Sequence, residues 1–405
     1  MNTYRKKVNK RAGSLFLLFT LSLAASAHPG AGAAAAGFND VPAAHWAKSG
    51  IDTAVNKGYV EGYPGGLFMP DASVSRAEFI KMIVTATGQP VEAAEGKWYE
   101  GYVAAAQQAG LYTTSDFANS ELEWNRKITR AEMARIAARA AGLKTKEDDK
   151  WMYLAAKAGL ISGLGAGKLG EQEHTTRAQS VTAVQRVLTV NSGGKLKVDK
   201  YAVSSAELAW HKTNIFTMMP EYFNYKSQMW TQYDSYEDQW REDKLTLSSK
   251  NNKYVATLHE LVAIDLEDPN DPNLKNVPPI KTLRWDYGAY EHPGFPVSNY
   301  KKAYLLYWKS TVKNDAPEHY KSYVYANIEI DGIGEYGNPK IREGVLTKSS
   351  SVYVKANGDS PYRIIPKVGG EKLERTVSGS IRTPSFSNYY YLSESLLSVY
   401  PHGDQ

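Results

Sequence analysis

Two hydrophobic patterns divide the chain near residue 192. Between residues 38 and 191 the chain is rich in alanine, and its apolar residues follow the spacing of helices. Beyond the Ser-Gly-Gly sequence at 192–194 alternation takes over, and in the segment 322–331 (SYVYANIEID) every second residue is apolar. Such alternation predicts a strand with one buried face. We therefore predict a multidomain protein, with an all-α unit followed by a mainly antiparallel β, sandwich-like domain at 201–405.

Further strands are predicted where similar segments are bounded by Gly, Pro or Asn turns. They are 253–264, 303–310, 344–356, 371–383 and 389–399. The helical spacing of Met229, Tyr233, Tyr236 and Trp240 predicts one helix before the sheet. Of the 28 tyrosines, 21 lie after residue 200. Tyrosines most often fill the interior of a sheet, although exposed ones could also stack on sugars.

A short sequence repeats three times within the helical half, each time directly before an apolar helix. It is Ser-Arg-Ala-Glu at 75–78, Thr-Arg-Ala-Glu at 129–132 and Thr-Arg-Ala-Gln at 176–179. Its first and fourth residues predict a capping box, in which the hydroxyl and the carboxylate or amide satisfy the first helix amides. The arginine is not explained this way, because the helix dipole disfavours a cation in the first turn. Two explanations stay open: an anion site beside unpaired helix amides, or an ion pair with a nearby carboxylate.

The first 27 residues have the order of a secretory signal peptide. Five cations lie within 5–11, an apolar run covers 14–25, and Ala-Ser-Ala at 25–27 is a cleavage site. The apolar run is shorter than the roughly 20 residues that span a bilayer. A small-residue spacer follows at 28–37. Because no later segment could span a membrane, and 401–405 carry neither a sorting signal nor a hydrophobic tail, we expect non-covalent attachment to the cell.

Charge and cysteine content exclude several classes of function. The formal net charge of +5 equals the number of leader cations, and the leader has no acids, so the remaining chain is neutral. Residues 28–194 carry 17 basic and 17 acidic residues, and 195–405 carry 26 of each. A protein that binds nucleic acid or an anionic bilayer normally shows a basic excess, so we predict neither partner. The chain has no cysteine, which excludes disulfides and thiolate chemistry.

Catalytic and metal-binding motifs are incomplete. His259 and Glu260 begin a zinc-protease motif but lack its second histidine, and Gly358-Asp-Ser360 lacks the second glycine of a nucleophile elbow. The acidic segment 265–271 is more typical of a solvated turn than of a calcium loop. We predict no enzyme, cofactor or metal. Two alternatives for the C-terminal domain stay open: an enzyme acting on polysaccharide, or a module that binds a glycan or solute.

The first helical segment resembles an S-layer homology module. The resemblance rests on several elements in order: FNDVPAAHWA at 38–47, Gly58, GYPGGLF at 62–68, Pro70 and SRAE at 75–78. Two later segments resemble the module more weakly but keep the capped helix. We therefore predict modules at 38–90, 91–143 and 147–191, joined to the C-terminal domain by a linker at 192–200.

This resemblance implies a pseudo-threefold helical unit whose grooves bind secondary cell-wall polysaccharide bearing pyruvate ketals. The arginine of the repeat, whose fork can hold a carboxylate bidentately, is the family's central binding residue, with aromatic and glycine residues nearby. The residues carried over are Arg76, Arg130, Arg177, Trp46, Gly62, Tyr63 and Trp98. For the two tryptophans, burial in the hydrophobic core is as good an explanation as contact with a sugar.

Departures from the family pattern weaken some of these assignments. Gly65 and Leu67 stand where the family usually has Asp and Thr, and the second segment lacks the Gly-Tyr-Pro sequence. In the third, Gln179 replaces the motif's Glu. Trp151 is too close to the next glycine to match Trp46, and Glu147 takes that position. We therefore expect that not all three grooves bind the polysaccharide. The groove of the first module is the strongest candidate.

The resemblance also implies a location and further partners. We expect a secreted protein at the cell wall or surface layer of a Gram-positive-type bacterium. Its C-terminal domain would be displayed as an S-layer-like structural or interaction module. Other surface-layer proteins are then possible partners, besides the wall polysaccharide.

Overall fold

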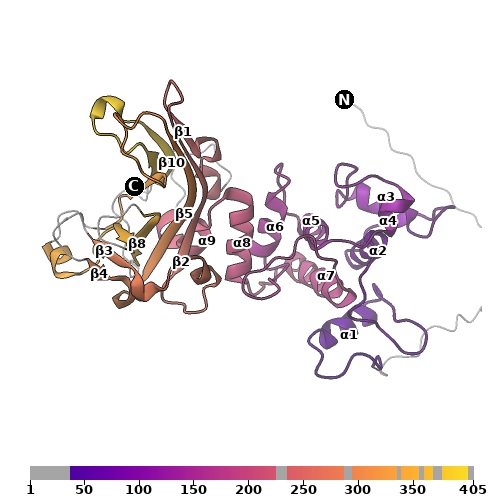
Figure 1. Ribbon diagram of the computed structural model, residues 1–405. Coiled ribbons are helices and arrows are strands. Elements are labelled where there is room, and N and C mark those ends of the chain that lie inside the picture. The colour runs from indigo at the N-terminus through magenta and orange to yellow at the C-terminus, as the bar shows by residue number, and fades with distance from the viewer. Residues whose placement is uncertain are drawn as a thin grey trace, which may run out of the picture. The chain divides into compact units, whose positions relative to one another are not determined.

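A computed structural model describes residues 37–224, 235–286, 294–334, 339–354, 360–367 and 376–399. The predicted signal peptide, nearly all of the predicted spacer and the segment 401–405 lie outside these residues. Helices occupy the N-terminal half of the described chain and antiparallel sheets the C-terminal half, as predicted (Figure 1).

The helical half begins soon after the start of the described chain and continues past residue 200. Its helices are α1 (Lys48–Asn56), α2 (Arg76–Ala86), α3 (Glu100–Gln108), α4 (Glu121–Asn125), α5 (Arg130–Ala140), α6 (Lys150–Lys157), α7 (Arg177–Asn191), α8 (Lys200–His211), α9 (Ile215–Met218) and α10 (Pro220–Phe223). None of these described helices has the length and apolar character needed to cross a membrane. The sequence analysis did not predict α8, α9 or α10.

Each repeated tetrapeptide forms the predicted capping box. The amide of the fourth residue donates to the first hydroxyl, and the first amide donates back to the fourth side chain, as in the pairs Ser75–Glu78, Thr129–Glu132 and Thr176–Gln179. Loss of such a cap typically costs about 1 kcal/mol. These boxes fix the residues at which α2, α5 and α7 begin.

The residues just before the three boxes form a closed cycle of backbone hydrogen bonds. The amide of Val74 donates to the carbonyl of Thr175 (3.1 Å), Thr175 donates to Ile128 (2.9 Å), and Ile128 donates back to Val74 (3.0 Å). All three residues are fully buried. We call these residues the backbone cycle. It joins three segments that are far apart in sequence at the centre of the helical half.

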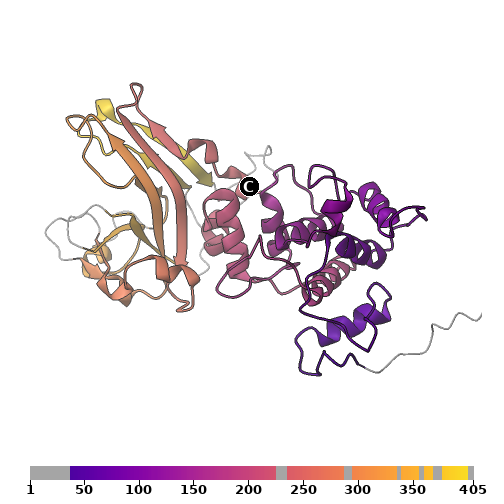
Figure 2. The ribbon, with the colours of Figure 1, turned by 45° about the vertical axis from the view of Figure 1, so that its right-hand side comes forward.

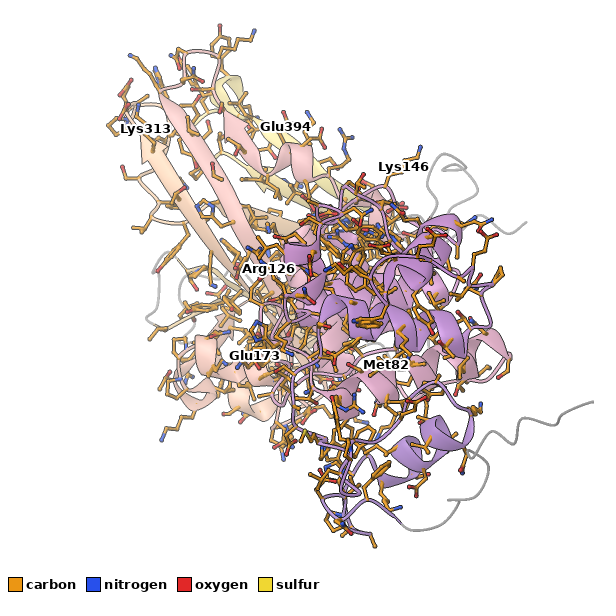
Figure 3. All side chains as sticks on the ribbon, turned by 90° about the vertical axis from the view of Figure 1, so that its right-hand side faces the viewer. Met82, Arg126, Lys146, Glu173, Lys313 and Glu394 are labelled. Carbon is orange, nitrogen blue, oxygen red and sulfur yellow. The ribbon has the colours of Figure 1, made fainter. Side chains whose placement is uncertain are left out.

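The first amide of each capped helix also has a backbone partner. Arg76 donates to the carbonyl of Arg126, and Arg130 donates to that of Glu173, each at 2.9 Å; Arg126 and Glu173 are labelled in Figure 3. Arg177 donates to the carbonyl of Ala72 at the same distance. The first amide of each helix, which was expected to be an unpaired donor for an anion, is therefore occupied, and this corrects the expectation for these three amides.

Helix α8 continues the helical core beyond the predicted linker at 192–200. Its apolar residues, Ala202, Val203, Ala206 and Trp210, belong to the same buried cluster as those of α1 to α7. A short 3-10 helix, η2 (Glu237–Gln239), adds a polar contact to α6. There the Glu237 carboxylate accepts from the Tyr153 hydroxyl at 2.6 Å and pairs with Lys157. The start of the C-terminal half is thus attached to the third predicted module.

The C-terminal half contains two antiparallel sheets (Figure 2). Their strands are β1 (Thr246–Ser248), β2 (Tyr254–Asp265), β3 (Arg284–Asp286), β4 (Phe295–Pro296), β5 (Ala303–Asn314), β6 (Asn327–Asp331), β7 (Ser350–Tyr353), β8 (Tyr362–Pro366), β9 (Val377–Arg382) and β10 (Ser393–Val399). The larger sheet has the order β1-β2-β5-β8-β7-β3-β4, and the smaller one β10-β9-β6. Apolar residues of both sheets share one buried cluster, and a second cluster covers the opposite face of the larger sheet.

A bulge in β2 changes which residues face which cluster. The pairing of β2 with β5 shifts register between Leu258 and Glu260. Ala256 and Leu258 before the bulge, and Leu261 and Ala263 after it, all face the cluster between the sheets. An extra residue in one strand reverses the alternation, which explains why even-numbered and then odd-numbered residues point to the same side.

The strand predictions succeed to different extents. Segments 253–264 and 303–310 match β2 and β5 closely, and 371–383 and 389–399 contain β9 and β10. The predicted strand at 322–331 begins only at Asn327, and Val324, predicted to be buried, is 71% exposed. Among the described residues of the segment 344–356, only 350–353 form a strand. Of the predicted helix at 229–240, residues 229–234 lie outside the described residues, and the described end contains a 3-10 turn and an extended Trp240, so the prediction of an α-helix is wrong for 235–240.

The backbone cycle gives a stability prediction. The Thr175 hydroxyl is buried without a hydrogen-bond partner among the described residues, whereas the other two members of the cycle, Val74 and Ile128, are apolar. Replacing Thr175 by Val removes this unsatisfied group and keeps the shape, so the free energy of unfolding should rise by about 1 kcal/mol. Urea unfolding measures the change. Thr182→Val is the control, because the Thr182 hydroxyl donates to the Ala178 carbonyl at 2.9 Å; an equal gain in both variants would contradict the argument.

Candidate functional site

The three repeated arginines are buried, and each reaches a loop that belongs to a different repeat. Arg76, Arg130 and Arg177 expose 7%, 5% and 6% of their surface. Arg76 contacts residues between 117 and 132, Arg130 contacts the loop 162–169, and Arg177 contacts the loop 61–68. Each guanidinium therefore contacts residues of another repeat, and the three sites differ in charge.

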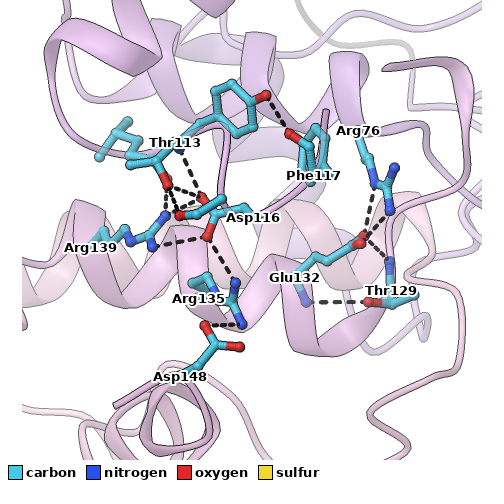
Figure 4. A network of polar contacts seen from close by, with 12 residues as sticks. Arg76, Thr113, Asp116, Phe117, Thr129, Glu132, Arg135, Arg139 and Asp148 are labelled. Atoms are coloured by element: carbon cyan, nitrogen blue, oxygen red, sulfur yellow. Dashed lines mark hydrogen bonds and ion pairs between the residues drawn. The ribbon is translucent and has the colours of Figure 1, made fainter. Parts of the chain in front are cut away.

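Arg76 is held by two carboxylates. Its guanidinium forms ion pairs with Glu123 and Glu132. Figure 4 shows the contact with Glu132, in which Nε lies 3.1 Å from Oε2, and the ring of Phe117, whose centre lies 4.2 Å from the guanidinium carbon. Burial opposes the charge, but the hydrogen bonds to Glu132 and Glu123 outweigh it and raise the pKa of Arg76. The ion-pair explanation therefore fits Arg76. This argues against the expectation that the first module has the best claim to a ligand.

A second charged cluster occupies the loop of the second repeat, which lacks the Gly-Tyr-Pro sequence. Asp116 accepts from Arg135 at 2.8 Å, from Arg139 at 3.0 Å and from the backbone amide of Thr113 at 2.8 Å (Figure 4). Burial acts to raise the pKa of Asp116, but the hydrogen bonds from Arg139 and Arg135 lower it overall. Arg135 also pairs with Asp148 at 2.9 Å, and these contacts together tie the loop to α5.

Arg177 is held by carbonyl oxygens instead. Nε donates to the Phe68 carbonyl at 2.9 Å and Nη2 to the Glu61 carbonyl at 2.8 Å, while the ring centre of Tyr63 lies 4.6 Å from the guanidinium carbon. Burial lowers the pKa of Arg177, and no carboxylate among the described residues forms an ion pair with it. Tyr63 thus lies beside Arg177 and not, as grouped from the sequence, with Arg76.

Gly62 shapes this loop. A Cβ atom at Gly62 would lie 2.2 Å from a ring carbon of Phe38, so only glycine allows the ring to pack there. The next residue, Tyr63, closes a tight turn by donating its amide to the Leu67 carbonyl at 2.7 Å. Gly65 lies in this turn with φ of +84°, a conformation that glycine adopts without strain. Gly62 therefore positions Tyr63 through packing.

Arg130 lies in a cavity with a second arginine. Its Nε donates to the Leu169 carbonyl and its Nη2 to the Ser162 carbonyl, both at 2.8 Å. Arg186 donates to the Ser162 hydroxyl at 3.1 Å, and both arginines line a cavity of about 230 Å³ together with Trp46. Burial lowers the pKa of both, and the charge of Arg186 lowers that of Arg130 further. Neither forms an ion pair among the described residues. The charge of Glu173 favours the charged form of Arg130 but does not offset burial, and the cavity lining itself contains two cations and no acid.

Arg186 and the loop at 162–169 were not among the residues predicted from the sequence. Leu164 donates its amide to the Lys168 carbonyl at 2.7 Å, which repeats the turn closed by Tyr63 and Leu67. The signal was present as Ile-Ser-Gly-Leu at 161–164, which aligns with Val-Glu-Gly-Tyr at 60–63. Arg186 follows Gln179 by seven positions, so both lie on the same face of α7.

The two tryptophans are exposed, so the alternative of a core position is wrong for both. Trp46 is 64% exposed and Trp98 56%. Trp46 lines the cavity of Arg130, and the ring of Trp98 contacts that of Tyr99 at 5.6 Å. In the third repeat Glu147, which takes the tryptophan position, accepts a hydrogen bond from Trp210 of α8 at 2.8 Å.

The described residues contain no cluster of side chains suited to a metal ion. In the acidic turn, Asp265 pairs with Lys200 and Lys367, and Asp271 accepts the amides of Asp265 and Asn273, each at 2.9 Å. These carboxylates hold the turn together.

Comparison with known proteins supports the assignment of the first repeat. Residues 37–80 match the family described as the S-layer homology domain. The chain is 31% identical to the S-layer protein sap of Bacillus anthracis over 153 residues, covering 36% of this chain and 18% of that protein. It is 30% identical to an S-layer protein of Bacillus licheniformis over 216 residues, covering 51% and 22%. An amylopullulanase of Thermoanaerobacterium thermosulfurigenes is 30% identical over 178 residues, covering 37% and 9%.

The chain spans about a fifth of the length of these two S-layer relatives. The matched domain and the S-layer relatives identify a secreted protein of the cell surface or cell wall, as predicted.

The Arg76 geometry predicts a mainly structural role. Replacing Arg76 by Ala leaves the Glu123 and Glu132 carboxylates without their common partner. The free energy of unfolding should fall by about 3 kcal/mol, as when a buried pair loses one member. Thermal melting checks this, with Arg126→Ala as control, because the Arg126 side chain is 57% exposed and its pair with Glu123 should contribute under about 1 kcal/mol. Unchanged melting of the Arg76 variant would contradict the ion-pair assignment.

The Asp116 cluster predicts a pH-dependent contribution to stability. A carboxyl group with a lowered folded-state pKa stabilises the fold above its unfolded pKa of about 3.9, and this contribution is lost as pH falls through the folded pKa. Asp116→Asn should therefore destabilise the protein at pH 7, and the difference from wild type should shrink below about pH 4. Urea unfolding across pH 3–7 measures it. The control is Asp71→Asn, because Asp71 is exposed and lies outside the cluster; the same pH profile for both would refute the cluster's role.

Proposed function

We propose that this cell-surface protein, which carries an S-layer homology domain at residues 37–80, is held to the bacterial cell wall by binding an anionic secondary wall polysaccharide. In this proposal the segments 38–90, 91–143 and 147–191 are three modules of one pseudo-threefold unit. Polysaccharide binds in grooves between the modules.

One observation carries the proposal: the paired cations in the Arg130 cavity. Arg130 is buried, Arg186 is partly buried, and neither forms an ion pair with a carboxylate among the described residues. Burying a charge without a counter-charge is costly, and an anionic ligand would remove that cost. The exposed ring of Trp46 at the same cavity offers a face to a sugar. A sugar that bears a carboxylate would supply an anion for the two arginines and a ring face for the indole of Trp46.

A pyruvate ketal on the wall polysaccharide is our candidate for this anion. Its carboxylate would accept charge-assisted hydrogen bonds from a guanidinium, while the sugar that carries it lies against the indole ring. The Arg177 site offers a similar combination of an arginine without an ion pair and the half-exposed ring of Tyr63. We place Trp98 in this second groove on sequence grounds, because its position in the second repeat matches that of Trp46 in the first.

We assign two binding grooves and not three. Arg76 already has two carboxylate partners, so an anionic ligand would have to displace them. The third repeat also has Glu147 where the others have tryptophan, and that carboxylate would repel an anion. In this proposal Arg76 stabilises the unit while Arg130 and Arg177 bind.

The C-terminal domain is, in this proposal, displayed by the anchor as a structural or interaction module of the surface layer. The S-layer relatives of Bacillus anthracis and Bacillus licheniformis support this reading, and we assign the domain no catalytic step.

Co-sedimentation of the full chain with purified wall sacculi tests the anchor. We expect Arg130→Ala to weaken binding about ten- to hundredfold, the loss of a charge-assisted hydrogen bond worth roughly 1.5–3 kcal/mol. Arg177→Ala should have an effect of the same kind. Removing the secondary polysaccharide, or only its pyruvate groups, should abolish binding of the wild type.

The matched control is Arg126→Ala, which removes an exposed arginine outside the grooves and should bind as the wild type does. Melting curves verify that every variant is folded. Full retention on peptidoglycan stripped of its polysaccharide would disprove the proposal, as would equal binding by the Arg130 and Arg126 variants.

A further inference from the structure

A cleft opens between the two sheets of the C-terminal half. It has a volume of about 540 Å³, within the range of sites for small ligands. One side is β6, which forms the edge of the smaller sheet, and the other is formed by β7 and β8 of the larger sheet. The cleft is far in sequence from the arginine grooves, and it shares no residue with them.

An ion pair between the sheets fixes a carboxylate in this cleft. Arg363 of β8 donates from Nη1 and Nη2 to one oxygen of Glu329 of β6, at 2.8 and 2.6 Å. The second oxygen, Oε1, accepts no hydrogen bond from the described residues, and the Glu329 side chain is 25% exposed. The ion pair therefore fixes the position of Glu329 Oε1, and this oxygen can still accept hydrogen bonds from a ligand.

Aromatic rings and an amide complete the lining. Tyr323 and Tyr391 line the cleft and are 36% and 46% exposed. Neither hydroxyl has a hydrogen-bond partner among the described residues, and the same holds for the side-chain amide of Asn327 on β6. Rings that present both an apolar face and a polar edge suit a ligand that has both kinds of surface.

The charges of the lining decide the class of ligand. The cleft contains two acids, Asp286 and Glu329, and two cations, Lys321 and Arg363, so it favours neither an anion nor a cation. The polar groups argue against a purely apolar ligand, which would leave them unsatisfied. We propose that this cleft binds a neutral, hydroxyl-rich oligosaccharide, with sugar hydroxyls donating to Glu329 and sugar rings lying against Tyr323 and Tyr391.

Titration calorimetry of the full chain with cellohexaose, maltohexaose and chitohexaose tests the proposal. We expect at least one of them to bind, and Tyr391→Ala or Tyr323→Ala to weaken that binding about tenfold or more, the effect of losing a ring contact and a hydrogen bond. Glu329→Gln should weaken it as well. The matched control is Tyr389→Ala, because Tyr389 is 87% exposed, two positions from Tyr391, and outside the cleft.

The design separates this cleft from the wall anchor. A double variant, Arg130→Ala with Arg177→Ala, should lose wall binding yet bind the soluble hexasaccharide like the wild type. The proposal is overturned if none of the three probes binds, if the Tyr389 variant loses as much affinity as the Tyr391 variant, or if the double variant loses the hexasaccharide. Tighter binding of hexagalacturonate, an anionic probe, would also overturn it.

Discussion

The helical half depends on the backbone cycle formed by Val74, Ile128 and Thr175. Each of these residues gives its amide to one partner and its carbonyl to the other, so none is fully paired unless the other two are in place. The repeated arginine lies two positions after each member, at the first residue of a capped helix. The cycle therefore sets the starting points of three helices together, and it directs each guanidinium toward a loop from another repeat.

The three arginines differ in the groups that stabilise the buried guanidinium. Arg76 has carboxylates, and its pKa is raised despite burial. Arg130 and Arg177 donate hydrogen bonds only to carbonyl oxygens, and the carboxylates that act on them at longer range do not offset burial, so their pKa values are lowered. The same backbone position thus carries an ion-paired cation in one repeat and cations without an ion pair in the two others, which is why our proposal places the ligand at the latter. Small changes in the loops, such as the presence of Glu123 near Arg76, decide between these states.

The sequence predicted those features that depend on neighbouring residues. The capping boxes follow from side chains three positions apart, and β2 and β5 follow from long apolar segments. Features that depend on distant contacts could not be predicted in this way. The pairing of Trp46 with Arg130, the grouping of Tyr63 with Arg177 and the carboxylates around Arg76 all join different repeats. The strand predicted from alternation also starts too early, because 322–326 precede β6 and Val324 is exposed. Nothing in the local pattern marks Asn327 as the point where pairing with β9 begins.

The backbone cycle also constrains the order of events during secretion. A chain that is exported from its N-terminus delivers Val74 to the cell surface well before Thr175, which lies 101 positions later. Until then, the amide of Val74 and the carbonyl of Ile128 lack the Thr175 groups that they pair with in the folded protein. The cycle therefore closes only after residues of the third repeat have emerged, so the first two repeats cannot complete the buried centre of the helical half on their own.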